Sequence, residues 1–238
     1  MNLLLLEDDD FLPDGTVRLG GRRLIHAREV LKALPDDVLR VGRLGGAVGT
    51  ARVLADDAQG LHLAPALNEA PPARAGVDLL LAIPRPKALK KILPAVASLG
   101  VNRLVLVNAA RVEKSYFDSK VLNAEFVGEL FRQGLEQARD TVLPELSVQP
   151  LFRPFVEDTL PGWLRANSTR LVLHPGASSQ PLERRQAGQH VTLAIGPDGG
   201  WVPFEVELLE KSGFQSVTLG PRILRTEVAI PSAFGAIG

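Results

Sequence analysis

The sequence predicts two domains, a small β domain followed by a larger α/β domain. In the first seventy residues, short strand-like pieces are interrupted by glycine, aspartate and proline. From residue 77 onward, apolar strands alternate with amphipathic helices, the pattern of a mainly parallel sheet with helices on both faces. Between them, Asn68–Arg74 carries two consecutive prolines, which favour an extended linker. We therefore place the domains at residues 1–70 and 76–238.

The first domain is expected to be a small β-barrel, because it holds several short strands within a short span. A single helix is expected at Leu24–Leu34, where Pro35 follows. The helical spacing places four apolar residues on one side, namely Ile25, Val30, Leu31 and Leu34. The expected strands are Asn2–Leu6, Thr16–Leu19, Val38–Leu44, Ala47–Leu54 and Gly60–Ala64.

The second domain is expected to alternate strands with helices. The expected strands are Val77–Ile83, Arg103–Val107, Leu171–His174, Val191–Ile195 and Ser216–Leu219. The expected helices are Pro86–Leu99, Val121–Arg139, Pro203–Lys211 and a last one from Leu224 to the C-terminus, interrupted by Pro231.

Composition excludes several classes of protein. The 238 residues include 45% hydrophobic residues, enough for a packed core, and no cysteine, which removes disulfides and thiolate metal sites. No apolar run approaches the roughly 18 residues of a membrane span, and the N-terminus lacks the features of a signal peptide. We expect a cytoplasmic protein without a metal. The balance of 27 basic and 27 acidic residues excludes a broad cationic surface, although local clusters of arginine remain possible.

The stretch Leu193–Trp201 has the form of a ligand-binding loop. A buried strand there runs into two glycine-bearing turns and then into a helix that carries Glu205 and Glu207. Ligands of open α/β sheets bind beyond the carboxyl ends of strands, where glycines allow a close approach to the backbone. The two carboxylates would repel phosphate, which leaves an adenosine or a cation. A tight loop without a ligand is the alternative.

Two further strand ends have a related form. Leu219–Glu227 follows a buried strand and places two arginines and a carboxylate at the entrance to the last helix. Helix capping would explain Glu227 alone, but not the run of residues before it. Leu173–Gly176 follows a third strand. Three such loops converging would make a site lined mostly by backbone groups.

These motifs resemble a known family. Ile195–Gly200 followed by Leu219–Glu227 resembles the signature pair of the RsmE family, the ribosomal RNA small-subunit methyltransferases E of the SPOUT class. The segment Gly134–Arg139 with Leu143 and Pro144 resembles the family's Glu-Gln helix and the Leu-Pro pair after it. In the first domain, His26 with Val30 and Leu31 resembles the family's H…VLR segment, so that the similarity covers essentially the whole chain.

The resemblance implies a PUA-like β-barrel followed by a SPOUT domain with a trefoil knot. It implies a homodimer that uses S-adenosylmethionine to methylate N3 of a uridine in the decoding region of 16S rRNA, either as naked RNA or in the assembled small subunit. By position in the motifs, the cofactor would lie against Leu173, His174, Pro175, Ile195, Gly196, Pro197, Gly199, Gly200, Leu219, Gly220, Ile223 and Leu224.

The chain also departs from the family pattern. Arg111–Phe117 stands where many members have a shorter Arg-Ser element, and Ala97–Gly100 replaces a Glu-Leu-Gly. Val228 occupies the place of a usual threonine, and Pro231 predicts a short or kinked last helix. We interpret the chain as a divergent branch.

Uridine N3 carries a proton that must leave before methylation. Arginine does not deprotonate in proteins, so Arg222 or Arg225 would instead stabilise negative charge on the uracil carbonyl oxygens. Our hypothesis assigns this charge stabilisation to Arg225 and proton acceptance to Glu227, provided that Glu227 can reach N3.

The first 115 residues contain one aromatic residue, Phe11, so base stacking by the β domain is not expected. Phosphate positioning is expected from basic residues, the candidates being Arg22, Arg23, Arg28, Arg85 and Lys87. Two alternatives stay open. One is a SPOUT methyltransferase with another target nucleotide, and the other is a non-catalytic RNA-binding assembly factor.

Overall fold

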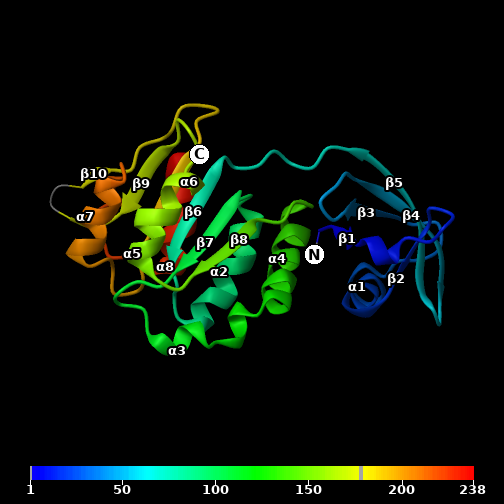
Figure 1. Ribbon diagram of the computed structural model, residues 1–238. Coiled ribbons are helices and arrows are strands. Elements are labelled where there is room, and N and C mark those ends of the chain that lie inside the picture. Colours follow the sequence, from blue (N-terminus) through cyan, green and yellow to red (C-terminus); the bar gives the residue numbers. More distant parts are fainter. Residues whose placement is uncertain (1, 177–178) are drawn as a thin grey trace. The chain divides into compact units, whose positions relative to one another are not determined.

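The computed structural model describes residues 2–176 and 179–238, which form two compact units (Figure 1). The first unit comprises the chain up to Ala73 together with Phe131–Leu143, and the second comprises Arg74–Leu130 and Pro144–Gly238. The segment Phe131–Leu143, which the sequence analysis assigned to the α/β domain, thus groups with the β unit.

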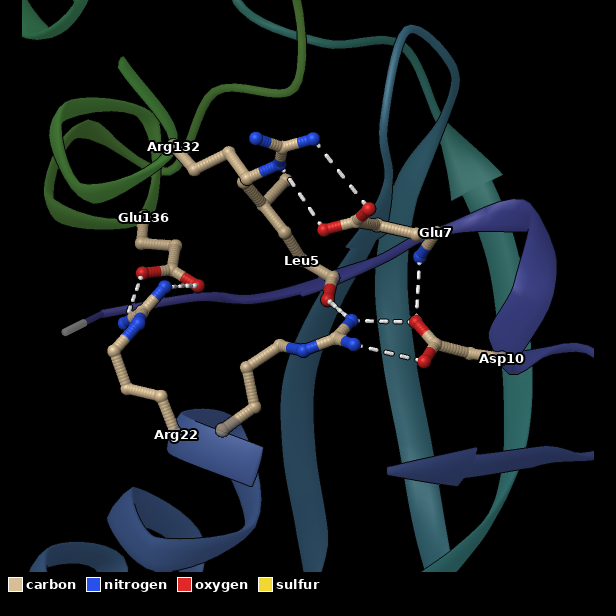
Figure 2. A network of polar contacts seen from close by, with 7 residues as sticks. Leu5, Glu7, Asp10, Arg22, Arg132 and Glu136 are labelled. Carbon is tan, nitrogen blue, oxygen red and sulfur yellow. Dashed lines mark hydrogen bonds and ion pairs between the residues drawn. The ribbon is translucent and has the colours of Figure 1, made fainter. Parts of the chain in front are cut away.

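Hydrogen bonds and ion pairs attach Phe131–Leu143 to the rest of the first unit. The Thr141 hydroxyl donates to the Gly46 carbonyl at 2.5 Å, and the Glu136 carboxylate accepts two hydrogen bonds from Arg22, at 2.9 and 3.2 Å. Arg132 Nε lies 3.0 Å from a Glu7 carboxylate oxygen (Figure 2). These polar contacts have no counterpart in the hydrophobic periodicity of the sequence, which explains why periodicity could not place the segment.

The first unit contains a five-stranded curled sheet. Its strand order is β1-β3-β4-β5-β2, with β1 and β3 parallel and the other pairs antiparallel. One face is packed with buried aliphatic side chains, including Leu4, Leu6, Val41 and Leu63. The strands are β1 Leu4–Leu6, β2 Val17–Leu19, β3 Val38–Arg43, β4 Val48–Asp57 and β5 Gly60–Glu69. All five strands predicted for this domain are present.

The helix of this unit differs in detail from its prediction. It starts as α1 (Gly21–His26), continues as the π-helical segment η2 (Ala27–Leu31) and ends at Lys32, whose φ of +52° is left-handed. The wider π turn changes the angular spacing of the side chains, so that Ala27 is buried and Leu24 is partly buried against the sheet. The four apolar residues predicted to share one side are exposed, namely Ile25, Val30, Leu31 and Leu34.

The second unit contains a seven-stranded sheet in which every pair is parallel. Its order is β10-β12-β9-β11-β6-β7-β8, which confirms the parallel α/β prediction. The strands are β6 Val77–Ala82, β7 Arg103–Val107, β8 Glu145–Gln149, β9 Thr169–Leu173, β10 Gln180–Pro181, β11 Val191–Ile195 and β12 Gln215–Thr218. The two unpredicted strands, β8 and β10, lie at the sheet edges, where burial is incomplete and the apolar pattern is weak.

Most predicted helices are present. The helices that follow β6, predicted and unpredicted together, are α2 Pro86–Ser98, α3 Lys114–Phe117, α4 Ala124–Ala138, α5 Phe152–Pro154, α6 Leu160–Trp163, α7 Pro203–Lys211 and α8 Thr226–Ile237. Two short 3-10 segments, η1 Asp8–Asp10 and η3 Lys120–Leu122, and a π-helical segment, η4 Phe155–Thr159, complete the set. The helical stretch from Phe152 to Trp163 was not predicted, because two prolines and a glycine interrupt its pattern.

The expected interruption of the last helix is wrong. Helix α8 continues through Pro231 to Ile237. Pro231 is exposed, so its ring projects into solvent. Because proline has no backbone N–H, its main cost to the helix is that the Glu227 carbonyl loses its hydrogen-bond donor.

The sheet order determines where a ligand can bind. The chain runs outward from β6 through β7 to β8, then crosses to β9, so that β11 lies between β9 and β6. This reversal is a topological switch point, and ligands of open parallel sheets bind there, beyond the carboxyl ends of the strands. Among the residues described, no helix is long and apolar enough to cross a membrane.

Candidate functional site

A pocket lies at the carboxyl ends of β9, β11 and β12, and it encloses about 630 Å³ when the part open to solvent is included. That size falls within the range of small-molecule sites. Its lining comprises Leu173, His174, Pro175, Ile195, Gly196, Pro197, Asp198, Gly200, Trp201, Val217, Thr218, Leu219, Arg222, Ile223, Leu224, Thr226 and Ala229. The structure therefore brings the three predicted loops together. Of the twelve residues proposed to contact a cofactor, Gly199 and Gly220 alone are absent from this lining, and both belong to the same loops.

The pocket walls suit an adenosine better than a polyphosphate. They consist mostly of aliphatic side chains and of backbone at the two glycine-bearing loops. Within the described chain, the charged side chains of the lining are one guanidinium, Arg222, and one carboxylate, Asp198. Apolar walls with a few polar groups are typical of sites for a planar ring and a sugar.

The glycines of the loop after β11 have a steric purpose. A Cβ on Gly196 would lie 3.1 Å from the Trp201 nitrogen and 3.2 Å from the indole ring, tighter than ordinary contact. Gly200 has a φ of +72°, in the region that side chains other than glycine rarely adopt. Glycine at these two positions therefore lets the turn fold back against Trp201 without a steric shift or backbone strain.

A buried carboxylate holds this loop region in place. Glu205, 2% exposed in the first turn of α7, accepts hydrogen bonds from the backbone N–H groups of Val202 at 2.9 Å and Ala110 at 2.7 Å. Nearby, the Arg111 guanidinium donates to the Gly199 carbonyl. The segment Arg111–Phe117, in which the chain departs from the family pattern, thus contacts the glycine loop beside the pocket.

The three predicted catalytic residues occupy different positions. Arg222 is exposed and lines the pocket, whereas Arg225 and Glu227 do not belong to the lining. Arg225 is the exposed N-cap residue of α8. Glu227 is half-buried in the first turn of α8, and its Oε2 atom is buried without a hydrogen-bond partner among the described residues.

Asp198 is a polar pocket residue that the sequence analysis did not single out. Its Oδ1 atom lies 3.4 Å from the Thr226 hydroxyl, which donates to it, and its Oδ2 atom lies 3.5 Å from Arg85 Nε. The only carboxylate in the lining is therefore partly neutralised by Arg85, within the part of the chain that is described. In the sequence, the only sign of its role was its position between Pro197 and the glycine pair Gly199 and Gly200.

Tyr116, from α3, is electrostatically coupled to this group. Partial burial raises the pKa of the Tyr116 phenol above its ordinary value of 10.0, and the acceptor Glu113, 3.1 Å away, raises it further. The charge of Asp198 acts in the same direction, while Arg85 opposes it. Tyr116 therefore stays neutral at physiological pH.

The predicted RNA-contacting arginines of the first unit form ion pairs. Arg22 pairs with the buried Glu136 (Figure 2). Arg23 donates to Asp10 at 2.5 and 2.8 Å and to the Leu5 carbonyl at 2.7 Å. Arg28 donates to Asp56 at 2.6 and 2.9 Å. Each positive charge therefore has a carboxylate beside it.

The other two predicted RNA-contacting residues belong to the second unit. Arg85 lies beside Asp198, and Lys87 is exposed on the first turn of α2. The described residues include no group of three side chains that could hold a metal ion.

Comparison with known proteins gives consistent results. A sequence profile described as an RNA methyltransferase domain matches residues 71–238. The chain is 30% identical over 241 residues to a protein of Treponema pallidum named ribosomal RNA small subunit methyltransferase E, covering all of this chain and 90% of that protein. It is 28% identical over 237 residues to the Mycobacterium tuberculosis protein of the same name, covering 96% and 89%.

Solved structures agree with the fold over almost the whole chain. A ribosomal RNA small subunit methyltransferase E of Neisseria gonorrhoeae, solved bound to S-adenosyl methionine, matches with a TM-score of 0.77 and 22% identity, covering 99% of this chain and 96% of that one. A probable rRNA-methyltransferase of Porphyromonas gingivalis matches with a TM-score of 0.75, 22% identity and the same coverage. At such identity the structural likeness concerns the fold alone.

Proposed function

The chain belongs to the ribosomal RNA small subunit methyltransferase E family of RNA methyltransferases, and from this premise we propose that it methylates N3 of a uridine in the decoding region of 16S rRNA, using S-adenosylmethionine. One observation carries the proposal at the level of this chain. The three loops that carry the family's motifs, distant in sequence, converge on a single pocket whose walls suit an adenosine.

The finer description of the fold is part of the proposal. We assign the first unit to the PUA-like barrels and the second to the SPOUT domains with a trefoil knot. The likeness of fold to a probable rRNA-methyltransferase and to a ribosomal RNA small subunit methyltransferase E, with TM-scores above 0.7, is one support for the assignment. The packing of the C-terminal helix α8 against α2 and β11 supports it too, because it returns the end of the chain to the middle of the sheet.

The residues of the pocket fit the proposed cofactor. S-adenosylmethionine supplies an electrophilic methyl group on a sulfonium sulfur when it is bound. The aliphatic side chains of Leu173, Ile195, Leu219 and Leu224 would contact its adenosine, and the backbone of the glycine loops would contact its polar edges. His174, Pro175, Gly196, Pro197, Gly199, Gly200, Gly220 and Ile223 complete the proposed cofactor site.

The protein must move one proton and stabilise one developing charge. Methylation forms a bond between N3 and the methyl carbon and breaks the bond from that carbon to sulfur, while the N3 proton passes to a base. We assign stabilisation of the negative charge on the uracil oxygens to Arg225, with Arg222 at the pocket wall as the second candidate. Guanidinium groups keep their protons, so the base must be a different group.

Two carboxylates compete for the role of base. Glu227 is the candidate proposed from the sequence, and its unpartnered Oε2 atom is free to accept a proton if α8 presents it to the substrate. Asp198 lines the pocket, but each of its carboxylate oxygens already has a partner, Arg85 for Oδ2 and the Thr226 hydroxyl for Oδ1. Geometry is the first requirement for a general base, so substitution of each in turn distinguishes the two.

The partners follow from the activity. The substrate is 16S rRNA or the assembled small subunit, and we place the enzyme in the cytoplasm, where that substrate is found. We also infer a homodimer formed by the second unit. Its support is a set of large apolar side chains left exposed on that unit, Leu151, Phe204, Ile223 and Val228, with Ile223 86% exposed.

The decisive experiment is mass spectrometry of 16S rRNA nucleosides from a strain lacking the gene. Loss of N3-methyluridine, restored by the wild-type gene, is the expected result. Loss of a different methylated nucleotide would instead identify another RNA methyltransferase. An unchanged modification profile, together with no S-adenosylmethionine binding in calorimetry, would identify a non-catalytic assembly factor.

A further inference from the structure

The sheet edge opposite the pocket concentrates positive charge. Because all strands of the second unit are parallel, the residues at their amino ends lie along one edge, away from the pocket at the carboxyl ends. Arg103 begins β7, His190 directly precedes β11, and Arg165 precedes β9 by four residues. All three converge on Asp78, the second residue of β6.

A single carboxylate oxygen receives all three groups. Asp78 is completely buried, and its Oδ2 atom lies 2.9 Å from Arg103 Nε, 3.2 Å from Arg165 Nε and 3.0 Å from His190 Nε2. Its Oδ1 atom is buried and has no hydrogen-bond partner in the described structure. One carboxylate oxygen thus orients the two guanidinium groups and the His190 ring.

The cluster has an excess of positive charge. Burial on its own would raise the pKa of Asp78, but the hydrogen bond from Arg103 and the close approach of His190 outweigh it and lower the pKa below its ordinary value of 3.8. Asp78 is therefore ionised at neutral pH and contributes one negative charge against two guanidinium charges. The excess remains one positive charge even when His190 is neutral.

The neighbouring charged groups do not cancel this excess. Arg185 donates to the carbonyls of Ala75, Gly76 and Gln189, which precede β6 and β11, so it adds a further positive charge at the same strand ends. Arg74 donates to the Val101 carbonyl. On the adjacent strand β8, Glu145 lies opposite Arg103 in the register and is exposed.

Arg165 is the member of the cluster that a ligand can reach. Its side chain is 45% exposed, compared with 15% for Arg103 and 19% for His190. Its Nε atom is held by Asp78, while its two terminal nitrogens bond nothing within residues 2–176 and 179–238. Arg103 is held from its other side by the Trp163 ring, 4.3 Å from the guanidinium carbon. The result is a guanidinium that is held at Nε by Asp78, is 45% exposed, and keeps both terminal nitrogens available as donors.

We propose that the amino-edge cluster, defined as Arg103, Arg165 and His190 around Asp78, binds a phosphate of the RNA backbone through Arg165. Guanidinium groups with two free donors bind phosphate oxygens in a bidentate geometry. This inference rests on the proposed function for its choice of RNA as the phosphate source. A structured RNA can reach both edges of the sheet, since a five-residue strand spans only about 17 Å.

The test measures binding of a 16S rRNA fragment to the full chain as a function of salt concentration. Three variants are compared with the wild type: Arg165→Gln, which removes the charge; Arg165→Lys, which keeps it; and Arg153→Gln as the control. Arg153 is also exposed and also paired, with Glu157 at 2.9 Å, but it lies on α5, which follows the carboxyl end of β8. Melting temperature and S-adenosylmethionine affinity are measured for each variant.

The expected result is a several-fold weaker RNA affinity for Arg165→Gln, with the slope of log K against log salt reduced by about 0.7 to 1. Arg165→Lys retains most of the slope, Arg153→Gln is unchanged, and cofactor affinity is unchanged in all three. An effect of Arg165→Gln on melting temperature alone would overturn the proposal in favour of a structural role. If Arg165→Gln abolished the binding of free phosphate at millimolar concentration but left RNA affinity unchanged, RNA would be overturned as the source.

The test also separates this proposal from the proposed function. A wild type that methylates the fragment, together with an Arg165→Gln variant that binds it equally well, would overturn the amino-edge site alone. A wild type that binds the fragment with a slope sensitive to Arg165 but never methylates it would overturn the proposed function alone. No binding of the fragment by the wild type would overturn both.

Discussion

The carboxylate of Glu205 accepts the backbone N–H of Ala110 at 2.7 Å, across 95 residues of sequence. Its other oxygen accepts the N–H of Val202 at 2.9 Å, and the side chain is 2% exposed. One buried group thus fixes the loop after β7 against the entrance of α7. Both segments border the glycine loop that lines the pocket.

Replacing Glu205 by alanine should therefore damage both stability and cofactor binding. Two backbone donors lose a charged acceptor inside the protein, which costs about 2–4 kcal/mol of unfolding free energy. Glu205→Gln keeps one acceptor oxygen, so its stability and cofactor affinity should lie between those of the wild type and those of the alanine variant. Denaturant unfolding and calorimetry with S-adenosylmethionine measure the effects. Glu207→Ala, at an exposed position of the same helix, is the control, and an equal loss there would contradict the explanation.

The behaviour of Glu205 shows what the sequence could and could not reveal. The bounds of β11 and α7 were predictable because a short apolar run and a proline-initiated amphipathic segment are local signals. That Glu205 points inward was not predictable, since its partner Ala110 is distant in sequence. The acidic start of α7 was interpreted as a charge facing the ligand, whereas the Glu205 carboxylate is occupied by backbone donors.

The candidate site follows the same pattern. Loops that follow apolar strands could be placed at one sheet edge from local motifs, and the structure brings them together. The role of Asp198 in the site became apparent only from its side-chain contacts with Arg85 and Thr226, which the structure supplies. In the first unit, the pairing of Arg22 with Glu136 joins residues 114 positions apart, which charge counting cannot detect.

Gly196→Ala should impair the pocket through a steric effect. The new Cβ would lie 3.1 Å from a backbone nitrogen of a nearly buried residue, Trp201, so that the loop must shift. We expect a loss of about 1–3 kcal/mol in stability and weaker cofactor binding.

The matched control for this substitution is Gly235→Ala. Gly235 lies inside α8, where a Cβ would meet nothing within 4 Å. Alanine there should stabilise the helix by about 0.5–1 kcal/mol. Denaturant unfolding of the two variants compares them directly, and opposite signs are expected. If both variants were stabilised, the contact with Trp201 would not constrain the loop.

Arg22→Gln and Arg28→Gln should separate structural from RNA-contacting arginines. Arg22 pairs with a carboxylate that is 1% exposed, so its removal should cost about 1–3 kcal/mol of stability. Arg28 pairs with Asp56 at the surface, and its removal should leave the melting temperature nearly unchanged. If Arg28 contacts phosphate as predicted, Arg28→Gln should reduce the salt slope of RNA binding by about 0.7 to 1. An unchanged slope would remove Arg28 from the RNA-binding set.

The lowered pKa of Asp78 predicts how stability depends on pH. The ionised carboxylate is favoured in the folded protein, so its contribution is fully present above the unfolded pKa of about 3.8 and disappears as the pH falls through the folded value. Asp78→Asn should therefore cost about 3–5 kcal/mol near neutral pH, because two guanidinium groups and the His190 ring lose their common carboxylate partner. Urea unfolding between pH 2 and 7 should show this difference shrinking only below about pH 4. A difference that grew on acidification would contradict the sign.

The choice between Asp198 and Glu227 as the base can be made by kinetics. Asp198→Asn keeps the shape and the Thr226 contact but removes the charge beside Arg85. Glu227→Gln likewise keeps the shape at the first turn of α8. Loss of the general base should lower kcat by about 10²- to 10⁴-fold at saturating RNA, with S-adenosylmethionine affinity nearly unchanged. Because the base must be ionised, the residual rate of that variant should also lose its acidic limb in the pH profile.

A large loss of kcat in Glu227→Gln alone would support the assignment from the sequence, and a large loss in Asp198→Asn alone would move it to the pocket wall. Full activity in both variants would rule out both carboxylates as the base.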